Sequence, residues 1–437
     1  MAALVMIFTF SMNAVAETIL LEHAIVHTVS GKTISAGSVL IQDGKIKGVF
    51  DDSLPTRIIY PSDTTKVDLK GQHLYPGIIA LNTALGLSEI SGVRSTRDAS
   101  EVGDYVPDVQ SWIAVNPDSE LLPVARANGI THIEPAPQSG IVAGQSGLVA
   151  LDGWTMEQMT YKKPTALHVH WPSMELDTTP KEKFKDKAKW KSPEDQAKER
   201  QKKLKELEDF FDEARAYANA REVAKKNKDG KFEVIPSWDA MMPFVRGDLP
   251  LMVHANELRQ IKAAVKWAGT NHFKIIIAGG RDAWMAADLL ATNKIPVVYD
   301  NTFTQAARDF QSYDVHFQAP GILQKAGVLL AFSLGADTFN AALVKNLPYE
   351  AAQAVAFGLP ADEAIKALTL NPAQILGVAD RLGSIEPGKD ATLFSCDGEI
   401  MDLRAPVKHV WISGKEMSLE SRHTRLYQKY KSRPKTN

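Results

Sequence analysis

Short apolar runs, each followed by a helix-like segment, are the feature that most limits how this chain can fold. Eight of them occur between residues 73 and 379, at 75–81, 131–135, 147–151, 166–171, 251–255, 273–278, 296–300 and 328–334. Nearly continuous apolar strands indicate a parallel sheet covered on both faces. Eight strand–helix units over this length predict an α/β chain whose centre is a (β/α)8 TIM-like barrel.

Strand-rich segments flank this central region on both sides, at 17–72 and 380–418. Asp43-Gly44 lies between two alternating apolar runs, which is a strong signal for a tight hairpin. A turn and two further strands follow Gly383, and Ser413-Gly414 marks another turn. We therefore expect a small discontinuous β-sandwich domain formed by both termini. Residues 419–437 are expected to form a C-terminal helix or tail.

A charged segment at 179–232 interrupts the strand–helix repeat. It begins lysine-rich and continues as a long helix, with Ser192 as the N-cap and Pro193 at the first helical position. Its apolar positions follow helical spacing: Leu204, Leu207, Phe211, Ala214, and Tyr217 or Ala218. The pattern predicts an amphipathic helix laid on the barrel. A further hypothesis, from its place between the fourth and fifth strands, is that the segment covers the barrel mouth as a lid.

Residues 2–16, AALVMIFTFSMNAVA, are apolar and end in small residues at Ala14 and Ala16. This pattern predicts a signal peptide cleaved after Ala16, and hence a periplasmic or secreted protein. The alternative is a buried N-terminal strand, and no Lys or Arg precedes the apolar run as a signal peptide usually requires. No later run is long enough to cross a membrane. The net charge of −2 gives no reason to expect nucleic acid as a partner, and one cysteine excludes an intramolecular disulfide.

Polar residues at the ends of the predicted strands are the candidates for chemistry, because barrel enzymes place catalytic groups there. These candidates are Asn82, Glu134, His168, His170, His254, Arg281, Asp300 and Asp337. His168 and His170 lie two apart on one strand, so both point to the same face and both can reach one ion there. The alternative is that these two histidines are packed and hydrogen-bonded, or face the outer helices.

Five stretches resemble one known family. The segment 71–86, GQHLYPGIIALNTALG, closely resembles the first barrel strand of the amidohydrolase superfamily. Segments 140–147, 346–352 and 369–377 resemble its imidazolonepropionase-like branch, and 383–391, GSIEPGKDA, resembles its discontinuous β-sandwich. The resemblance covers nearly everything after residue 16.

The resemblance implies hydrolysis by a water molecule activated on one or two divalent metal ions. In the family the ligands are a His-x-His of the first strand, a bridging group of the fourth, histidines of the fifth and sixth, and an Asp of the eighth. Here the first-strand histidines fall on Asn82 and Ala84, the preceding Asp falls on Ala80, and the sixth-strand histidine is absent. His254 matches the fifth-strand histidine, and Asp337 is the nearest match to the catalytic Asp.

A relocated site for zinc or another divalent metal would then use His168, His170, His254 and Asp337. Three hypotheses follow. The first is a secreted hydrolase of carbon–nitrogen bonds other than peptide bonds, with one ion or none. The second is an inactive barrel that binds a small molecule or a protein. The third is a metal-free enzyme with Asp337 or Glu134 as base.

In each enzyme hypothesis the partner is a small-molecule substrate, with Asn82, Arg281 and Asp300 as candidate substrate-binding residues. The resemblance also allows a homo-oligomer.

Overall fold

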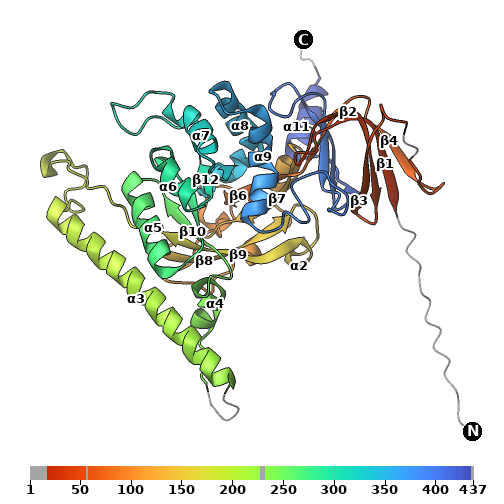
Figure 1. Ribbon diagram of the computed structural model, residues 1–437. Coiled ribbons are helices and arrows are strands. Elements are labelled where there is room, and N and C mark those ends of the chain that lie inside the picture. Colours follow the sequence, from red (N-terminus) through yellow and green to blue (C-terminus); the bar gives the residue numbers. More distant parts are fainter. Residues whose placement is uncertain (1–16, 56–57, 227–231, 301, 435–437) are drawn as a thin grey trace, which may run out of the picture.

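The computed structural model describes residues 17–55, 58–226, 232–300 and 302–434. The predicted signal peptide therefore lies outside the described residues. Two sheets of eight strands each dominate the molecule, one central and one formed at the termini (Figure 1). No helix in the described part of the chain has the length and apolar character that crossing a membrane requires.

The central sheet contains a strand at each of the eight predicted positions. Its members are β6 (Ile78–Thr83), β7 (Ile130–Pro135), β8 (Val142–Ala150), β9 (Thr160–His170), β10 (Leu251–Ala255), β11 (Ile275–Gly279), β12 (Val297–Asp300) and β13 (Leu330–Ser333). They are hydrogen-bonded in sequence order from β6 to β13. Where the two end strands meet, the Ser333 hydroxyl donates to the Asn82 carbonyl at 3.2 Å, so the sheet closes almost completely into a barrel. The predicted barrel is confirmed.

The expectation of a wholly parallel sheet is wrong at the third strand. β8 runs antiparallel to both β7 and β9, whereas the other pairs are parallel. The reason is the length of the connections. Residues 136–141 join β7 to β8, and a parallel crossover needs about a dozen residues or more. The chain therefore turns back as a hairpin instead of crossing over the barrel through a helix.

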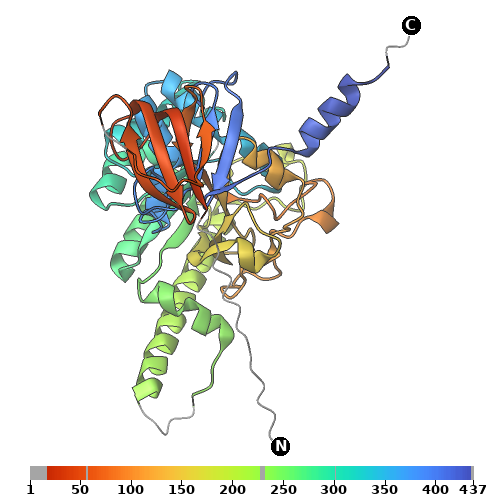
Figure 2. The same cartoon turned by 90° about the vertical axis from the view of Figure 1, so that its right-hand side faces the viewer.

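Helices and short 3-10 turns surround the barrel. The α-helices are α1 (Leu121–Arg126), α2 (Met156–Met159), α3 (Pro193–Lys226), α4 (Pro236–Val245), α5 (Leu258–Asn271), α6 (Ala287–Thr292), α7 (Val315–Lys325), α8 (Leu347–Ala356), α9 (Ala361–Leu368), α10 (Leu370–Ile375) and α11 (Arg422–Lys431). The 3-10 turns are η1 (Arg94–Thr96), η2 (Ser111–Ala114), η3 (Lys181–Lys183), η4 (Ala283–Ala286) and η5 (Thr338–Asn346). In Figure 2, α11 projects away from the body.

The terminal sheet joins both ends of the chain. Its strands are β1 (Thr18–Val26), β2 (Ile34–Gln42), β3 (Lys45–Asp51), β4 (Thr65–Asp68), β5 (His73–Pro76), β14 (Leu393–Cys396), β15 (Val407–Ile412) and β16 (Lys415–Glu416). β5 pairs with β1 on one side and β14 on the other. Gly77 then carries the chain from β5 into β6. A side chain there would come within 2.2 Å of the Thr131 hydroxyl, so only glycine fits this passage.

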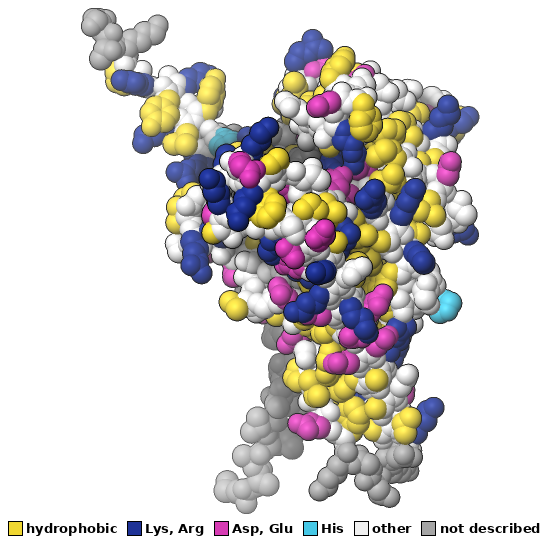
Figure 3. Space-filling view, turned by 90° about the vertical axis from the view of Figure 1, so that its left-hand side faces the viewer, with side chains coloured by type: hydrophobic (Ala, Val, Ile, Leu, Met, Phe, Trp, Pro, Cys, Tyr) yellow, Lys and Arg dark blue, Asp and Glu magenta, His cyan; other side chains and the backbone are white. Residues whose placement is uncertain are grey.

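The long helix α3 confirms the predicted apolar stripe. Leu207, Phe211, Ala214 and Ala218 are buried, and the Phe211 ring packs against Trp267 and Phe273. The helix runs diagonally along the outside of the barrel beside α4 and α5 (Figure 1). On the side of the molecule shown in Figure 3, acidic and basic side chains are interspersed, as expected for a solvated face.

Candidate functional site

The interior of the barrel is apolar at its base and becomes polar towards the carboxyl ends of the strands. The buried interior side chains are Ile79, Leu81, Leu148, Ala166, Met252, Ile276, Ala278, Val298 and Ala331. Because side chains alternate along a strand, residues two positions further on also face the interior. The sequence therefore directs His168 and His170 inward above Ala166, and His254 inward above Met252. By the same rule, Asp300 and Ser333 face inward on β12 and β13.

Three histidines lie together at the ends of β9 and β10. His170 and His254 are register partners, and their rings stack with centroids 4.1 Å apart. His168 Nδ1 lies 2.9 Å from His254 Nε2, a hydrogen-bond distance. His168 is fully buried, whereas His170 and His254 are partly exposed. The structure thus brings together the three histidines selected from the sequence.

Burial makes all three histidines weak bases. It lowers the pKa of His168 to about 3, and burial together with the neighbouring imidazoles lowers the pKa of His254 well below its ordinary value. The pKa of His170 is also lowered, chiefly by burial. The cluster is consequently uncharged at neutral pH and can exchange hydrogen bonds without adding positive charge to the barrel mouth.

Asp300 is the carboxylate of this mouth. Its two oxygens lie 3.3 and 3.2 Å from the side-chain nitrogen of Asn82, which donates to both. Burial raises the pKa of Asp300 to about 7, although hydrogen bonds from Ser333 and Asn82 partly oppose the shift. The residue as a whole is only partly exposed, at the carboxyl end of β12. A base with a pKa near neutrality is suited to proton transfer at physiological pH.

Asn82 reaches Asp300 because its backbone departs from the regular strand. Its φ is 49°, in the left-handed region that asparagine tolerates better than most residues. The pairing of β6 with β7 shifts register between Ala80 and Thr83, so the alternation of side chains breaks at this point. Asn82 therefore takes part in the site despite its buried strand position.

Asp337, expected as the catalytic carboxylate, is placed elsewhere. It is exposed and caps η5, where its Oδ1 accepts from the Phe339 amide at 2.8 Å. The end of β13 is Ser333, which pairs in register with Asp300. The eighth strand therefore ends four residues before Asp337.

Glu134 faces the interior but is closed to a substrate. It is fully buried, and the Ser146 and Thr165 hydroxyls donate to its Oε1 at 2.8 and 3.0 Å. Burial raises its pKa despite these hydrogen bonds. Its surroundings are those of a structural carboxyl group beneath the mouth.

An arginine and carboxylate cluster, which sequence reasoning mostly missed, lies above the ends of β10 and β11. Arg308 donates to both oxygens of Asp282, at 2.9 and 2.6 Å, and to Glu175 at 2.8 Å. Arg281 lies beside the same carboxylates. Only Arg281 was selected from the sequence, because Arg308 and Glu175 lie in irregular segments with no strand-end signal.

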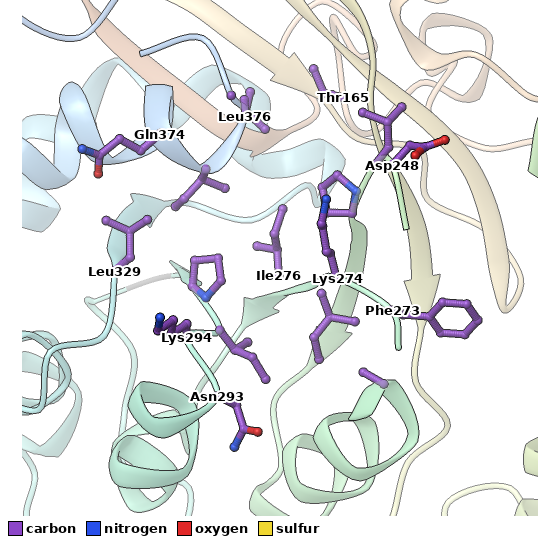
Figure 4. A pocket seen from close by; sticks show the side chains of 18 of the residues that line it. Thr165, Asp248, Phe273, Lys274, Ile276, Asn293, Lys294, Leu329, Gln374 and Leu376 are labelled. Atoms are coloured by element: carbon purple, nitrogen blue, oxygen red, sulfur yellow. The ribbon is translucent and has the colours of Figure 1, made fainter. Parts of the chain in front are cut away.

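Two pockets lie beside the barrel. One, of about 570 Å³, lies past the carboxyl ends of β9 and β10, between the loop that follows β9 and α3, with Ser173, Glu175 and Glu257 on its wall together with Glu199 and Lys203 of α3. A second pocket, of about 590 Å³, lies at the opposite end, where Pro250, Lys274, Pro296 and Leu329 precede four strands (Figure 4). The second pocket is remote from the chemistry because catalytic groups of such barrels lie at the carboxyl ends.

A family model, the amidohydrolase family, matches residues 155–417, which is more than half of the chain. The chain belongs to the amidohydrolase family. The superfamily predicted from the sequence is thus confirmed, and with it membership of a family of hydrolases. The imidazolonepropionase-like branch remains a prediction.

Three relatives show how far this amidohydrolase resembles known proteins. A curated relative, amidohydrolase tasK of Hapsidospora irregularis, is 22% identical over 86% of this chain, and the chain spans only 39% of its length. A crystal structure of an amidohydrolase from Thermotoga maritima is 26% identical and superposes with a TM-score of 0.77, covering 92% of this chain and 99% of that one. An adenosine deaminase from Xanthomonas campestris with bound zinc is 17% identical, with a TM-score of 0.52 over 91% and 92% of the two chains. The adenosine deaminase structure shares the fold of this chain.

The metal centre of the amidohydrolase family does not fit the residues present. The family positions of the first strand hold Asn82 and Ala84, and the sixth strand ends in Gly279 and Gly280. In residues 17–55, 58–226, 232–300 and 302–434, no group of three or more His, Cys, Asp or Glu side chains is arranged to hold a metal ion. The nitrogens of His168 and His254 that face each other are engaged with one another. We derive no catalytic step through a metal.

Proposed function

We propose that this chain hydrolyses a carbon–nitrogen bond other than a peptide bond in a small polar substrate, at the mouth of the barrel, with Asp300 as the base. Membership of the amidohydrolase family supports hydrolysis. The observation that carries the assignment is the Asp300 carboxyl group at the carboxyl end of β12, with its pKa raised by burial to about 7 and its geometry held by Asn82. This replaces Asp337 as the candidate base.

The proposed reaction needs one proton acceptor that later becomes a donor. Asp300 accepts a proton from a water molecule as the water oxygen adds to the carbonyl carbon. The tetrahedral intermediate then collapses, the carbon–nitrogen bond breaks, and the leaving nitrogen takes the proton back from Asp300. A carboxyl group with a pKa near 7 can both accept and donate a proton at neutral pH at a small cost in free energy.

The histidine cluster contributes polar but uncharged groups to the same mouth. His170 and His254 are partly exposed as residues, and the buried Nε2 atom of His170 has no hydrogen-bond partner among the described residues. In the proposed site this nitrogen binds a polar group of the substrate. The other form of this hypothesis is a metal centre with fewer ligands that holds one divalent ion. Such a centre would have to use the same histidine nitrogens and break the contact between His168 and His254.

The test compares two carboxylates. Purified protein beginning at residue 17 is assayed for amine release from a panel of N-acyl amino acids and cyclic amides. Asp300→Asn is expected to lower kcat by about a hundredfold or more, the scale of general-base catalysis. Asp337→Asn, which alters an exposed carboxylate, should retain wild-type activity. Loss of activity in Asp337→Asn with none in Asp300→Asn would reject the assignment.

A binding barrel without catalysis is the second candidate function. It is favoured by the joint replacement of family ligands at residues 80, 82 and 84. Saturable binding of a panel compound, with no product formed by wild type under any condition of pH or added zinc, would favour this candidate.

We also propose that the protein is exported to the periplasm or secreted, and that it can form homo-oligomers. Support for export is the apolar segment 2–16 with its small residues at 14 and 16. Detection of a mature N-terminus at Glu17 after expression in a host with a secretion pathway would test export. Sedimentation analysis would test oligomerisation.

A further inference from the structure

Arg281 lies at the barrel mouth immediately after β11, next to the strand that carries Asp300. Gly279, the last residue of β11, pairs with Tyr299, the residue before Asp300, and Arg281 follows two positions later in the chain. The Asn256 side chain accepts from the Arg281 amide at 3.3 Å and holds the backbone at this position. The side chain is 29% exposed, so it is covered but still reached from solvent.

The guanidinium group of Arg281 has unused hydrogen-bonding capacity. Its Nε and Nη2 atoms are buried and have no hydrogen-bond partner within the part of the chain that the structure describes. The nearest carboxylate oxygens belong to Asp282 and Glu175, at 3.6 and 3.7 Å. These separations allow charge attraction but exceed hydrogen-bond length.

Both neighbouring carboxylates are already engaged by other groups. Arg308 donates to the two oxygens of Asp282, and the Leu258 amide donates to one of them at 3.1 Å. Arg308 also donates to Glu175 Oε1, the oxygen nearest Arg281. Burial alone would raise the pKa of Asp282, but these hydrogen bonds and the two arginine charges lower it below its ordinary value. Asp282 therefore stays ionised, and its attachment to Arg308 leaves Arg281 free for another acceptor.

A buried histidine lies on the other side of Arg281, in the layer between β12 and α7. His316, on α7, is fully buried, and its Nε2 atom also has no partner among the described residues. Its Nδ1 atom lies 3.1 Å from the Tyr299 hydroxyl. Burial and the charge of Arg281 lower the pKa of His316, which places it within the electrostatic reach of that arginine. The buried guanidinium donors of Arg281 are costly to leave without acceptors, so a bound acceptor is favoured there.

We propose that Arg281 binds a carboxylate group of the substrate, which makes the substrate class a small amide that carries a free carboxylate, such as an N-acyl amino acid. This inference rests on the proposed function, because it assumes that the substrate occupies the mouth beside Asp300. A planar guanidinium presents paired donors that match the two oxygens of a carboxylate.

Binding is measured by isothermal titration with matched probes. N-acetylglycine and N-benzoylglycine carry the carboxylate, and their primary carboxamides are the neutral counterparts. Wild type is expected to bind the carboxylate of a pair about tenfold or more tightly than the amide, the factor that hydrogen bonds to a charged group supply. Arg281→Met should remove this preference while leaving amide binding unchanged. Arg404→Met, at an arginine paired only with Asp402 on the surface, should retain the preference.

Melting temperatures of the variants show whether each is folded. Arg281→Lys keeps the positive charge but lacks the paired donors of the guanidinium, so it should retain only part of the carboxylate preference. Wild type without a carboxylate preference, or Arg281→Met with the preference intact, would overturn the proposal. Asp300→Asn distinguishes it from the proposed function. If Asp300→Asn keeps its turnover and Arg281→Met loses the carboxylate preference, Asp300 is not the base but the Arg281 subsite stands. If Asp300→Asn loses its turnover and Arg281→Met keeps the carboxylate preference, only the subsite is rejected.

Discussion

Asn82 donates its side-chain amide to both carboxylate oxygens of Asp300, at 3.3 and 3.2 Å, across the line where the first and last strands of the barrel meet. The two residues are 218 positions apart in the chain. The resemblance of segment 71–86 to the family implies that this asparagine falls where a metal-binding histidine is expected.

Removing the Asn82 amide should raise the pKa of Asp300 further. Asn82→Gly deletes the donor but keeps a residue that adopts the positive φ without strain. A hydrogen bond to a charged group contributes about 1.5–3 kcal/mol, so the acidic limb of the pH–rate profile should move upward by about one to two pH units. His272→Gly, which changes another residue with positive φ, should leave the profile in place. An unchanged profile in Asn82→Gly would contradict the pairing.

Asp300 should make the protein less stable as pH rises from about 4 to about 7. Its pKa is about 7 in the folded state and about 3.9 in an unfolded chain, so the unfolded chain loses its proton first over this interval. The folded state then binds more protons, and the free energy of unfolding falls with pH by at most about 1.4 kcal/mol per pH unit. In Asp300→Asn this contribution to the fall of the free energy of unfolding with pH is absent. Its stability relative to wild type should increase from pH 4 to pH 8 in denaturant titrations.

Asp337→Asn is the control for that measurement, because asparagine caps a helix about as well as aspartate. Its difference from wild type should stay nearly constant with pH. A constant difference for Asp300→Asn as well would show that the Asp300 carboxyl group titrates normally.

The protein should not need a tightly bound metal. Because the histidine and carboxylate positions do not form a metal centre, we expect well under one equivalent of zinc by plasma mass spectrometry after growth with added zinc. Activity should survive prolonged chelation. Near one equivalent of metal in wild type, lost in His254→Ala, would instead establish the relocated single-ion site.

Phe211 should anchor α3 to the barrel. It is fully buried against Trp267 and Phe273, so Phe211→Ala should lower the free energy of unfolding by about 3–5 kcal/mol. Phe310→Ala removes a ring that is 81% exposed and should change stability little. Equal melting temperatures for the two variants would show that α3 contributes little to the stability of the barrel.

The sequence by itself determined the places of the eight barrel strands, the buried stripe of α3 and the identity of residues 80, 82 and 84, where the resemblance predicts that the family ligands are absent. These features are local: apolar runs, helical spacing and residue identity are readable without knowing what lies opposite. The proximity of His168, His170 and His254 could also be predicted from the sequence, because the alternation of side chains along neighbouring parallel strands fixes which of them share a face.

Only the tertiary structure decided the direction of β8, the burial of Asp300 beside Asn82 and the pairing of Arg308 with Asp282. Strand direction depends on the exact length of a connection, which apolar runs do not delimit. The pKa of Asp300 depends on burial and on an asparagine far away in the chain, and the bulge that turns Asn82 inward breaks the alternation on which sequence reasoning relies. Charge pairing between irregular loops, as in Arg308 with Asp282, has no periodic signal and emerges only when the loops meet in space.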